Sequence, residues 1–487
     1  MSMSPNKLIL ALLLLAGCSD TSSSKSADPI VGKDSSFPAF TSIVKLADSA
    51  TSTDTSTSQS FNVPLPALAG AELALHMDGD ALFEKKFNTE SGVGPAFNAQ
   101  TCVSCHARDG RGSLPVIPFG QTVVRLGSTE AILLRISLEN SSGSKLVPGF
   151  TEQLFHRGVY DLRPDAPGSG QADIDMSYAT STFTYPDGRV VSLRKPVFKL
   201  VNGYDAVGGK KSALEDPDLR ISPRMGPPMI GLGLIEAIDA RDILALADPD
   251  DANGDGISGR PNMIDGKLGR FGWKANTSSI RNQVAGAFSN DMGIRSSILP
   301  VESISGTALF TSLIQRLGID WKPLETELPD SSLDALEFYA ATLAVPQRRN
   351  VEVPTVRNGA RTFEKIGCTG CHTPHFRTST SAGISATVRG LDIYPFSDEL
   401  LHDMGDELAD NRPDHLANGR EWKTRPLWGI GKTQTINPSA GFLHDGRARN
   451  LEQAILYHGG EAAAVRTRFS NLNAPERQEL ISFLLSL

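Results

Sequence analysis

The chain has 487 residues, 40% of them hydrophobic and 21% charged, which is enough to form two or more domains with sizeable cores. Its formal net charge of −8 at pH 7 is not the basic balance of a nucleic-acid-binding protein, so no nucleic-acid partner is expected. Four of its five cysteines fall in two short motifs, and the fifth is Cys18.

Residues 1–18 predict a lipoprotein signal peptide. Lys7 precedes the apolar run 8–15, and Leu-Ala-Gly-Cys at 15–18 resembles the bacterial lipobox, in which the cysteine, here Cys18, receives a lipid. The apolar run is too short to span a membrane. An ordinary signal peptide with a chance cysteine is the alternative. Residues 19–60 are rich in Ser, Thr, Asp and Lys and predict a flexible tether.

Two copies of Cys-x-x-Cys-His, at 102–106 and 368–372, predict two covalently bound c-type haems. In each copy the cysteines form thioether bonds to the haem and the histidine binds its iron. This assigns Cys102, Cys105, Cys368 and Cys371 to haem attachment, and His106 and His372 to the iron. A zinc ribbon would place its Cys pairs about 15 to 20 residues apart, and a redox dithiol would not need the histidine.

An internal repeat surrounds the motifs. Gly79 and Phe83 precede the first motif, as Gly359 and Phe363 precede the second. Each copy closes with a run in which Leu, an aromatic residue and Leu recur at i, i+3 and i+7, a one-face helical pattern. These closing runs are at 336–343 and 480–487. The pattern predicts the first and last helices of a cytochrome c domain, twice.

The first copy is longer than the second. Segments rich in β-branched residues at 122–126 and 132–136, and a hairpin-like stretch at 183–191, predict strands. We therefore expect a mainly α fold of two tandem cytochrome c-type domains. These are residues 61–346, carrying a large β-containing insertion at about 115–330, and residues 347–487.

An acidic loop at 251–256 matches the opening of an EF-hand calcium loop. Asp251, Asn253 and Asp255 would supply oxygen ligands at alternate positions, and Gly256 would allow the sharp turn. Position twelve is Asn262, where an EF-hand has Glu. An acidic, glycine-rich surface turn without an ion is the alternative.

Several segments resemble one known family. Trp-Lys-Thr-Arg-Pro-Leu-Trp at 422–428, followed by Phe-Leu-His-Asp-Gly at 442–446, resembles the closing part of bacterial dihaem cytochrome c peroxidases. Gly-Arg-Phe-Gly-Trp-Lys-Ala at 269–275 and Ser-Asp-Glu-Leu-Leu-His-Asp-Met-Gly at 397–405 are similar to one branch of that superfamily. This branch is the di-haem oxidoreductase (putative peroxidase) family, also labelled thiol oxidoreductase. The likeness covers nearly all of the chain after residue 65 and implies two haems and one calcium ion.

The resemblance also implies iron ligands. The peroxidase pattern places the second ligand of the C-terminal haem fourteen residues after the histidine of His-Asp-Gly, which leads from His444 to His458. Methionine is usual there, so His458 departs from the pattern and a lower reduction potential is expected. His402 and Met404 are rival ligands, and a surface histidine at a helix end is the alternative reading of His458.

The N-terminal haem differs, because residues 107–147 contain no histidine where the family's switching peroxidases carry a distal one. We expect an open or water-bound sixth position there; His76 and His156 are more readily structural. Peroxide cleavage needs an acid or base. Glu236 follows an apolar, glycine-rich stretch in which burial would raise its pKa, although it could equally cap a helix.

Two functional classes follow. The first is a dihaem oxidoreductase of the cytochrome c peroxidase type, whose C-terminal haem relays electrons through Trp273 to a reactive N-terminal haem; Trp422 and Trp428 compete for the relay role. The second is a non-catalytic electron-transfer cytochrome. The expected partners are a small redox protein or other electron donor, and peroxide or another small substrate. The expected location is the periplasmic side of a bacterial membrane, held by the lipid alone, with the outer membrane favoured because Ser19 follows Cys18.

Overall fold

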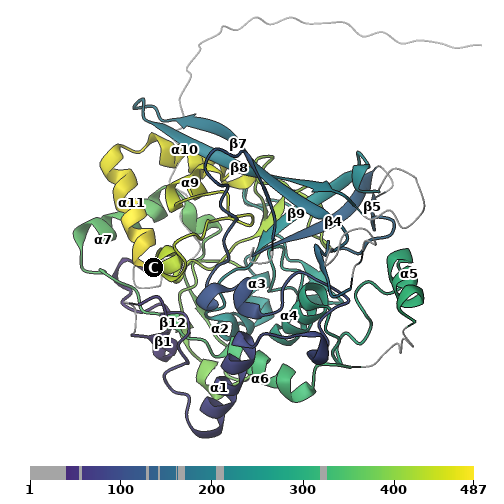
Figure 1. Cartoon of the computed structure of the whole chain (residues 1–487). Coiled ribbons are helices and arrows are strands. Elements are labelled where there is room, and N and C mark those ends of the chain that lie inside the picture. Colours follow the sequence, from purple (N-terminus) through teal and green to yellow (C-terminus); the bar gives the residue numbers. More distant parts are fainter. Residues whose placement is uncertain are drawn as a thin grey trace, which may run out of the picture. The chain divides into compact units, whose positions relative to one another are not determined.

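The computed structural model describes residues 40–53, 57–127, 131–140, 143–160, 162, 170–203, 213–318 and 326–487. The predicted signal peptide, Cys18 and most of the tether lie outside these residues. Figure 1 shows the arrangement of the described elements.

Two crossed helix pairs carry the internal repeat. Helix α1 (Gly70–Glu84) packs on α6 (Asp330–Ala341), and α7 (Pro354–Lys365) packs on α11 (Ala474–Ser486) (Figure 1). Both crossings need glycine. A Cβ on Gly79 would lie 2.3 Å from the backbone oxygen of Ala335, and a Cβ on Gly359 would lie 1.9 Å from that of Glu479. The predicted first and last helices are therefore confirmed in both copies. The close crossing explains the glycine in the first helix of each pair.

Two three-stranded antiparallel sheets form the β-structure between these pairs. Strands β7 (Asp173–Thr184) and β8 (Val190–Val201) make a long hairpin, and β3 (Val123–Arg125) extends it alongside β7. In the second sheet, β4 (Ile132–Asn140) lies between β5 (Gly143–Lys145) and β9 (Leu219–Met225). Apolar side chains of both sheets form one buried cluster. The predicted segments 122–126, 132–136 and 183–191 fall on β3, on β4 and on the turn end of the β7–β8 hairpin.

The prediction of a mainly α fold is nevertheless wrong. Of the residues that the structure describes, 32% are in helices and 19% in strands, and the strands belong to several sheets. Two causes account for the error. Only the end of the β7–β8 hairpin was read from the sequence, although its pairing runs from Thr184 opposite Val190 back to Asp173 opposite Val201. In addition, two-residue strands such as β1 (Thr51–Ser52) and β12 (Val345–Pro346) pair segments far apart in the chain and leave no local pattern.

The other elements are short and connect these units. The helices are α2 (Leu232–Glu236), α3 (Ala240–Leu244), α4 (Ile280–Ala287), α5 (Ala308–Leu317), α8 (Thr433–Ile436), α9 (Leu451–Leu456) and α10 (Ala463–Asn471). The strands are β2 (Ala96–Phe97), β6 (Arg157–Gly158), β10 (Met263–Ile264), β11 (Lys267–Leu268), β13 (Phe376–Arg377), β14 (Asp392–Ile393), β15 (Leu401–Asp403) and β16 (Glu421–Lys423).

Candidate haem-binding site

The two Cys-x-x-Cys-His motifs fold into the same tight turn. The backbone N–H of His106 donates to the Cys102 oxygen at 2.9 Å, and that of His372 donates to the Cys368 oxygen at 2.9 Å. All four thiols are free. Burial raises the pKa of the Cys102 and Cys368 thiols to about 12. A redox dithiol needs a lowered thiol pKa, so this environment disfavours that alternative.

Three half-buried histidines share one hydrogen-bonding pattern. Nδ1 of His106 donates to the Pro227 oxygen at 2.7 Å, Nδ1 of His372 to the Phe396 oxygen at 2.8 Å, and Nδ1 of His458 to the Ala454 oxygen at 2.8 Å. A carbonyl only accepts, so Nδ1 carries the proton and Nε2 keeps its lone pair. Burial lowers the pKa of all three, to about 4 for His106 and His372. Neutral imidazoles held in this way are the ordinary form of a metal-binding histidine.

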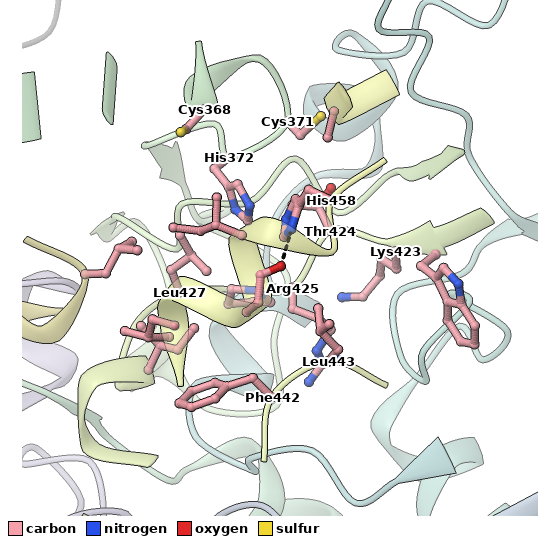
Figure 2. A pocket seen from close by; sticks show the side chains of 18 of the residues that line it. Cys368, Cys371, His372, Lys423, Thr424, Arg425, Leu427, Phe442, Leu443 and His458 are labelled. Carbon is pink, nitrogen blue, oxygen red and sulfur yellow. Dashed lines mark hydrogen bonds between the residues drawn. The ribbon is translucent and has the colours of Figure 1, made fainter. Parts of the chain in front are cut away.

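A cavity surrounds the second motif (Figure 2). It holds about 1860 Å³ of space free of protein atoms, part of it open to solvent, and its lining is mostly apolar. Cys368, Cys371, His372 and His458 all line it. Helix α9 ends just before His458, which lies close enough to His372 to lower that residue's pKa. Two thiols, two imidazoles and an apolar lining fit a c-type haem with two histidine ligands.

The rival ligand His402 is already engaged. Its Nε2 lies 2.8 Å from an Asp398 carboxylate oxygen and its Nδ1 lies 2.7 Å from a Glu461 carboxylate oxygen. Although burial opposes a charge on His402, neighbouring Cys371 and Asp398 raise its pKa well above the usual range. Neither ring nitrogen is left for an iron. Met404, the other rival, lines the cavity.

One segment, residues 225–231, forms a wall shared by the two motifs. A Cβ on Gly226 would lie 2.3 Å from a backbone oxygen of the first motif, and the oxygen of Pro227 accepts the hydrogen bond from that motif's histidine. Pro228 and Ile230 line the cavity of the second motif. Successive residues of this wall therefore face the two sites.

Trp273 lies beside the shared wall. Its indole N–H donates to the Met225 oxygen at 2.8 Å, and its side chain lines the cavity. The guanidinium carbons of Arg111 and Arg425 each lie 5.3 Å from its ring centre. The competing tryptophans, Trp422 and Trp428, also line the cavity.

Three cavity residues carry no functional prediction from the sequence. Arg111 and Arg425 are far apart in the sequence and come together only in the folded chain. Burial lowers the pKa of both guanidinium groups, to about 9 for Arg111. His444 stacks on Trp422, with ring centres 3.8 Å apart and planes 9° from parallel. In the sequence, Arg425 and His444 stand out only as members of the family-like segments at 422–428 and 442–446. These segments assign neither residue a role.

The first motif has different surroundings. The Tyr339 hydroxyl donates to an Asp109 carboxylate oxygen at 2.7 Å, and burial raises the pKa of Asp109 to about 7. His76 bonds Thr342 Oγ1 at 2.8 Å through Nδ1, and His156 donates from Nε2 to the Gly127 oxygen at 3.2 Å. These contacts give both histidines a structural role. Asp109 was not singled out in the sequence, since a lone Asp after the motif has no distinctive pattern.

The predicted proton-transfer residue and the predicted calcium ligands are not among the residues that line the cavity. Glu236 accepts the backbone N–H of Ile280 at 2.8 Å, at the first turn of α4, and it is not among the cavity-lining residues. In the acidic loop, Asp251, Asn253 and Asp255 accept backbone N–H groups of the loop itself. Across the described ranges, no three His, Cys, Asp or Glu side chains are grouped so that they could hold a metal ion. Both predictions remain untested.

In the part of the chain that the structure describes, no helix has the length and apolar character needed to cross a membrane. No curated protein matches the chain. Among solved structures, hydrazine synthase of Kuenenia stuttgartiensis, pressurised with 20 bar xenon, is similar at 18% identity, covering 53% of this chain and 87% of that one. Its TM-score of 0.22 carries no argument about fold or function. The family model described as "Di-haem oxidoreductase, putative peroxidase" matches residues 41–487, and the chain therefore belongs to this family of di-haem oxidoreductases.

Proposed function

We propose that the protein is a c-type dihaem oxidoreductase with one relay site and one reactive site. Its two haem-binding halves are residues 61–346 and 347–487. The haems are attached through the cysteines of the two motifs, with His106 and His372 as proximal ligands. The observation that carries the proposal is the shared pose of His106, His372 and His458, each with Nδ1–H on a backbone carbonyl. That pose leaves each Nε2 for an iron.

When bound, each haem supplies an iron that gains and loses one electron and that binds a small ligand where a coordination position is free. His372 and His458 would occupy both axial positions in the C-terminal half, which suits a relay. The shared wall at 225–231 and Trp273 lie between the motifs, and we assign the electron path to them.

The reactive site is assigned to the N-terminal half. In this half the described histidines outside the motif are His76 and His156. Both have structural partners, so a free sixth position at this iron is consistent with the contacts. Peroxide or another small substrate would bind there, with electrons from a small redox protein or other donor. Glu236, whose pKa burial raises, is the proposed proton-transfer residue despite its capping contact.

Replacing His458 tests the ligand assignment. His458→Gly should convert one low-spin haem per chain to high spin, because one axial imidazole is removed. The matched control is His375→Gln, three residues after His372 and bonded to Asp392 at 2.8 Å, which should leave the spectrum unchanged. An unchanged EPR spectrum in His458→Gly would show that His458 is not a ligand.

Activity distinguishes the two functional classes. The pure holoprotein should reduce hydrogen peroxide when supplied with a reduced cytochrome or dye. If no small ligand binds either iron and no peroxide is consumed, the protein is instead a dihaem electron-transfer cytochrome, the second candidate.

Location is proposed separately. We infer export and a lipid on Cys18, with the outer membrane favoured and no other membrane attachment. Cells fed labelled palmitate should label the wild-type protein but not Cys18→Ser. Label in neither protein would contradict the lipid anchor while leaving the haem assignment intact.

A further inference from the structure

Arg111, which is buried, and Arg425, which is half-buried, line one cavity, and neither forms an ion pair with a described carboxylate. Arg111 is 7% exposed; its Nη2 donates to the Leu443 oxygen, and its Nε has no hydrogen-bond partner. Arg425 makes no hydrogen bond or ion pair with any described residue, and its guanidinium lies over the Trp273 ring. The two positive charges also repel each other, and the charge on Arg425 lowers the pKa of Arg111. An unpaired charge beside a largely apolar cavity is costly, so two guanidinium groups placed together favour the binding of an anion there.

The nearby carboxylates already have partners. Glu399, the acid that acts most strongly on Arg425, forms an ion pair with Lys423 and accepts the Ser397 hydroxyl at 3.0 Å. Asp445, the acid that acts on Arg111, is bonded by Arg447 at 2.8 Å. Neither carboxylate can neutralise the arginine pair without losing its present partner.

The cavity itself indicates where an anion would come from. Arg111 and Arg425 line the same cavity as Cys368, Cys371 and His372. Figure 2 shows Arg425 beyond His372 and His458 from the two cysteines. A c-type haem is attached to cysteines along its vinyl-derived edge and carries two propionate carboxylates on the opposite edge. Arginine is well suited to carboxylates, because its planar guanidinium donates two parallel hydrogen bonds.

We propose that Arg111 and Arg425 form the propionate-binding site of the haem attached to Cys368 and Cys371. The inference rests on the proposed function, since it requires a haem in this cavity. Arg111 lies in the N-terminal half, five residues after His106. The inference therefore adds that a residue of the N-terminal half binds the haem of the C-terminal half. Trp273, in contact with both guanidinium groups, would then lie at the propionate edge and would be positioned by the haem itself.

The test compares four single variants of the holoprotein. Arg111→Gln and Arg425→Gln remove the proposed contacts. Arg466→Gln removes a cation that lines the same cavity nearer His458, and Arg361→Gln removes an exposed one on α7. Haem content is checked by pyridine haemochrome. The readouts are the midpoint potential of each haem and the propionate bending modes in resonance Raman spectra.

In Arg111→Gln and Arg425→Gln we expect a lower potential for the low-spin haem and a shifted propionate mode. Arg466→Gln should lower the potential without shifting that mode, and Arg361→Gln should change neither. Unchanged propionate modes in both arginine variants, a shift in Arg466→Gln alone, or changes confined to the high-spin haem would overturn the inference. Wild-type protein without two haems, or without a low-spin one, would instead contradict the proposed function.

Discussion

In the N-terminal half, the ring of Phe83 lies 5.3 Å from that of Tyr339; in the C-terminal half, the ring of Phe363 lies 5.2 Å from that of Phe483. The two helical frames therefore hold corresponding aromatic rings at nearly the same distance. The chemistry attached to them differs, because Tyr339 donates a hydrogen bond to buried Asp109 and Phe483 has no hydroxyl. A repeated frame can thus hold the two Cys-x-x-Cys-His motifs alike while leaving the surroundings of each motif free to differ.

The same contrast holds for the axial positions. The proximal histidines lie at matching distances from their phenylalanines, 6.1 Å for His106 and 6.0 Å for His372. In the C-terminal half, His458 presents a second imidazole to the cavity. Closed coordination in one half and an open position in the other would separate electron relay from substrate reaction.

The largest expected effect comes from removing the carboxylate of Asp109, which distinguishes the N-terminal half from the C-terminal half. Its folded-state pKa of about 7 lies above the unfolded value of 3.8, so its favourable contribution to stability is present below about pH 4 and is lost as pH rises through about 7. Across that window the unfolding free energy should fall by up to about 4 kcal/mol through this group. In Asp109→Asn this part of the pH dependence should disappear.

Urea unfolding of the holoprotein at several pH values would measure this effect. Asp265→Asn, in the exposed turn between β10 and β11, is the matched control and should follow the wild-type profile. If Asp109→Asn and the wild type show the same pH dependence, the buried acid does not distinguish the two halves.

The next effect tests whether the two frames are equivalent. Gly79→Ala and Gly359→Ala should each destabilise the protein by roughly 1–3 kcal/mol or more, because the new methyl group meets backbone across the helix crossing. Gly286→Ala in α4 is the matched control, since the new methyl group would come no closer than 3.9 Å to a neighbour outside its own helical turn, Asn290 Nδ2. That change should be neutral or stabilising by about 0.5–1 kcal/mol. A cost at only one of the two crossings, measured by thermal unfolding, would show that the frames differ.

The smallest effect concerns the predicted calcium ion at Asp251, Asn253 and Asp255. Removing calcium with a chelator should lower stability by about 1.4 kcal/mol relative to a free calcium concentration ten times the Kd. The spectra of both haems should not change. Asp255→Asn should make the chelator's effect smaller. Elemental analysis showing no calcium after dialysis against millimolar calcium would eliminate the site.

The sequence predicted those parts of the site that depend on local spacing. The Cys-x-x-Cys-His turns, the paired glycines and the closing helices are short patterns, and each is where the sequence predicts it. His458 was reached by a fixed offset along the chain from His444. What could not be predicted depends on contacts between distant residues: Arg111 and Arg425 are far apart in sequence yet contact the same Trp273 ring.

The balance of helix and strand was missed for the same reason. In β7 the apolar–polar alternation of residues 173–178 gives way to Ala-Thr-Ser-Thr at 179–182, and two-residue strands are defined by their partners alone. Glu236 shows that a local sequence pattern can also fit two different roles. Its sequence context, an apolar and glycine-rich stretch, is shared by a buried catalytic acid and by the helix-capping residue found in the structure.

Cyanide binding tests the central claim most directly. The oxidised and the half-reduced holoprotein would be titrated with cyanide and followed by EPR and absorbance, with both haems counted. We expect one equivalent to bind per chain, to remove the high-spin signal of the N-terminal haem, and to leave the His372–His458 signal unchanged. Binding to neither iron in either state would contradict the reactive site, and binding to both in the oxidised state would contradict the closed relay site.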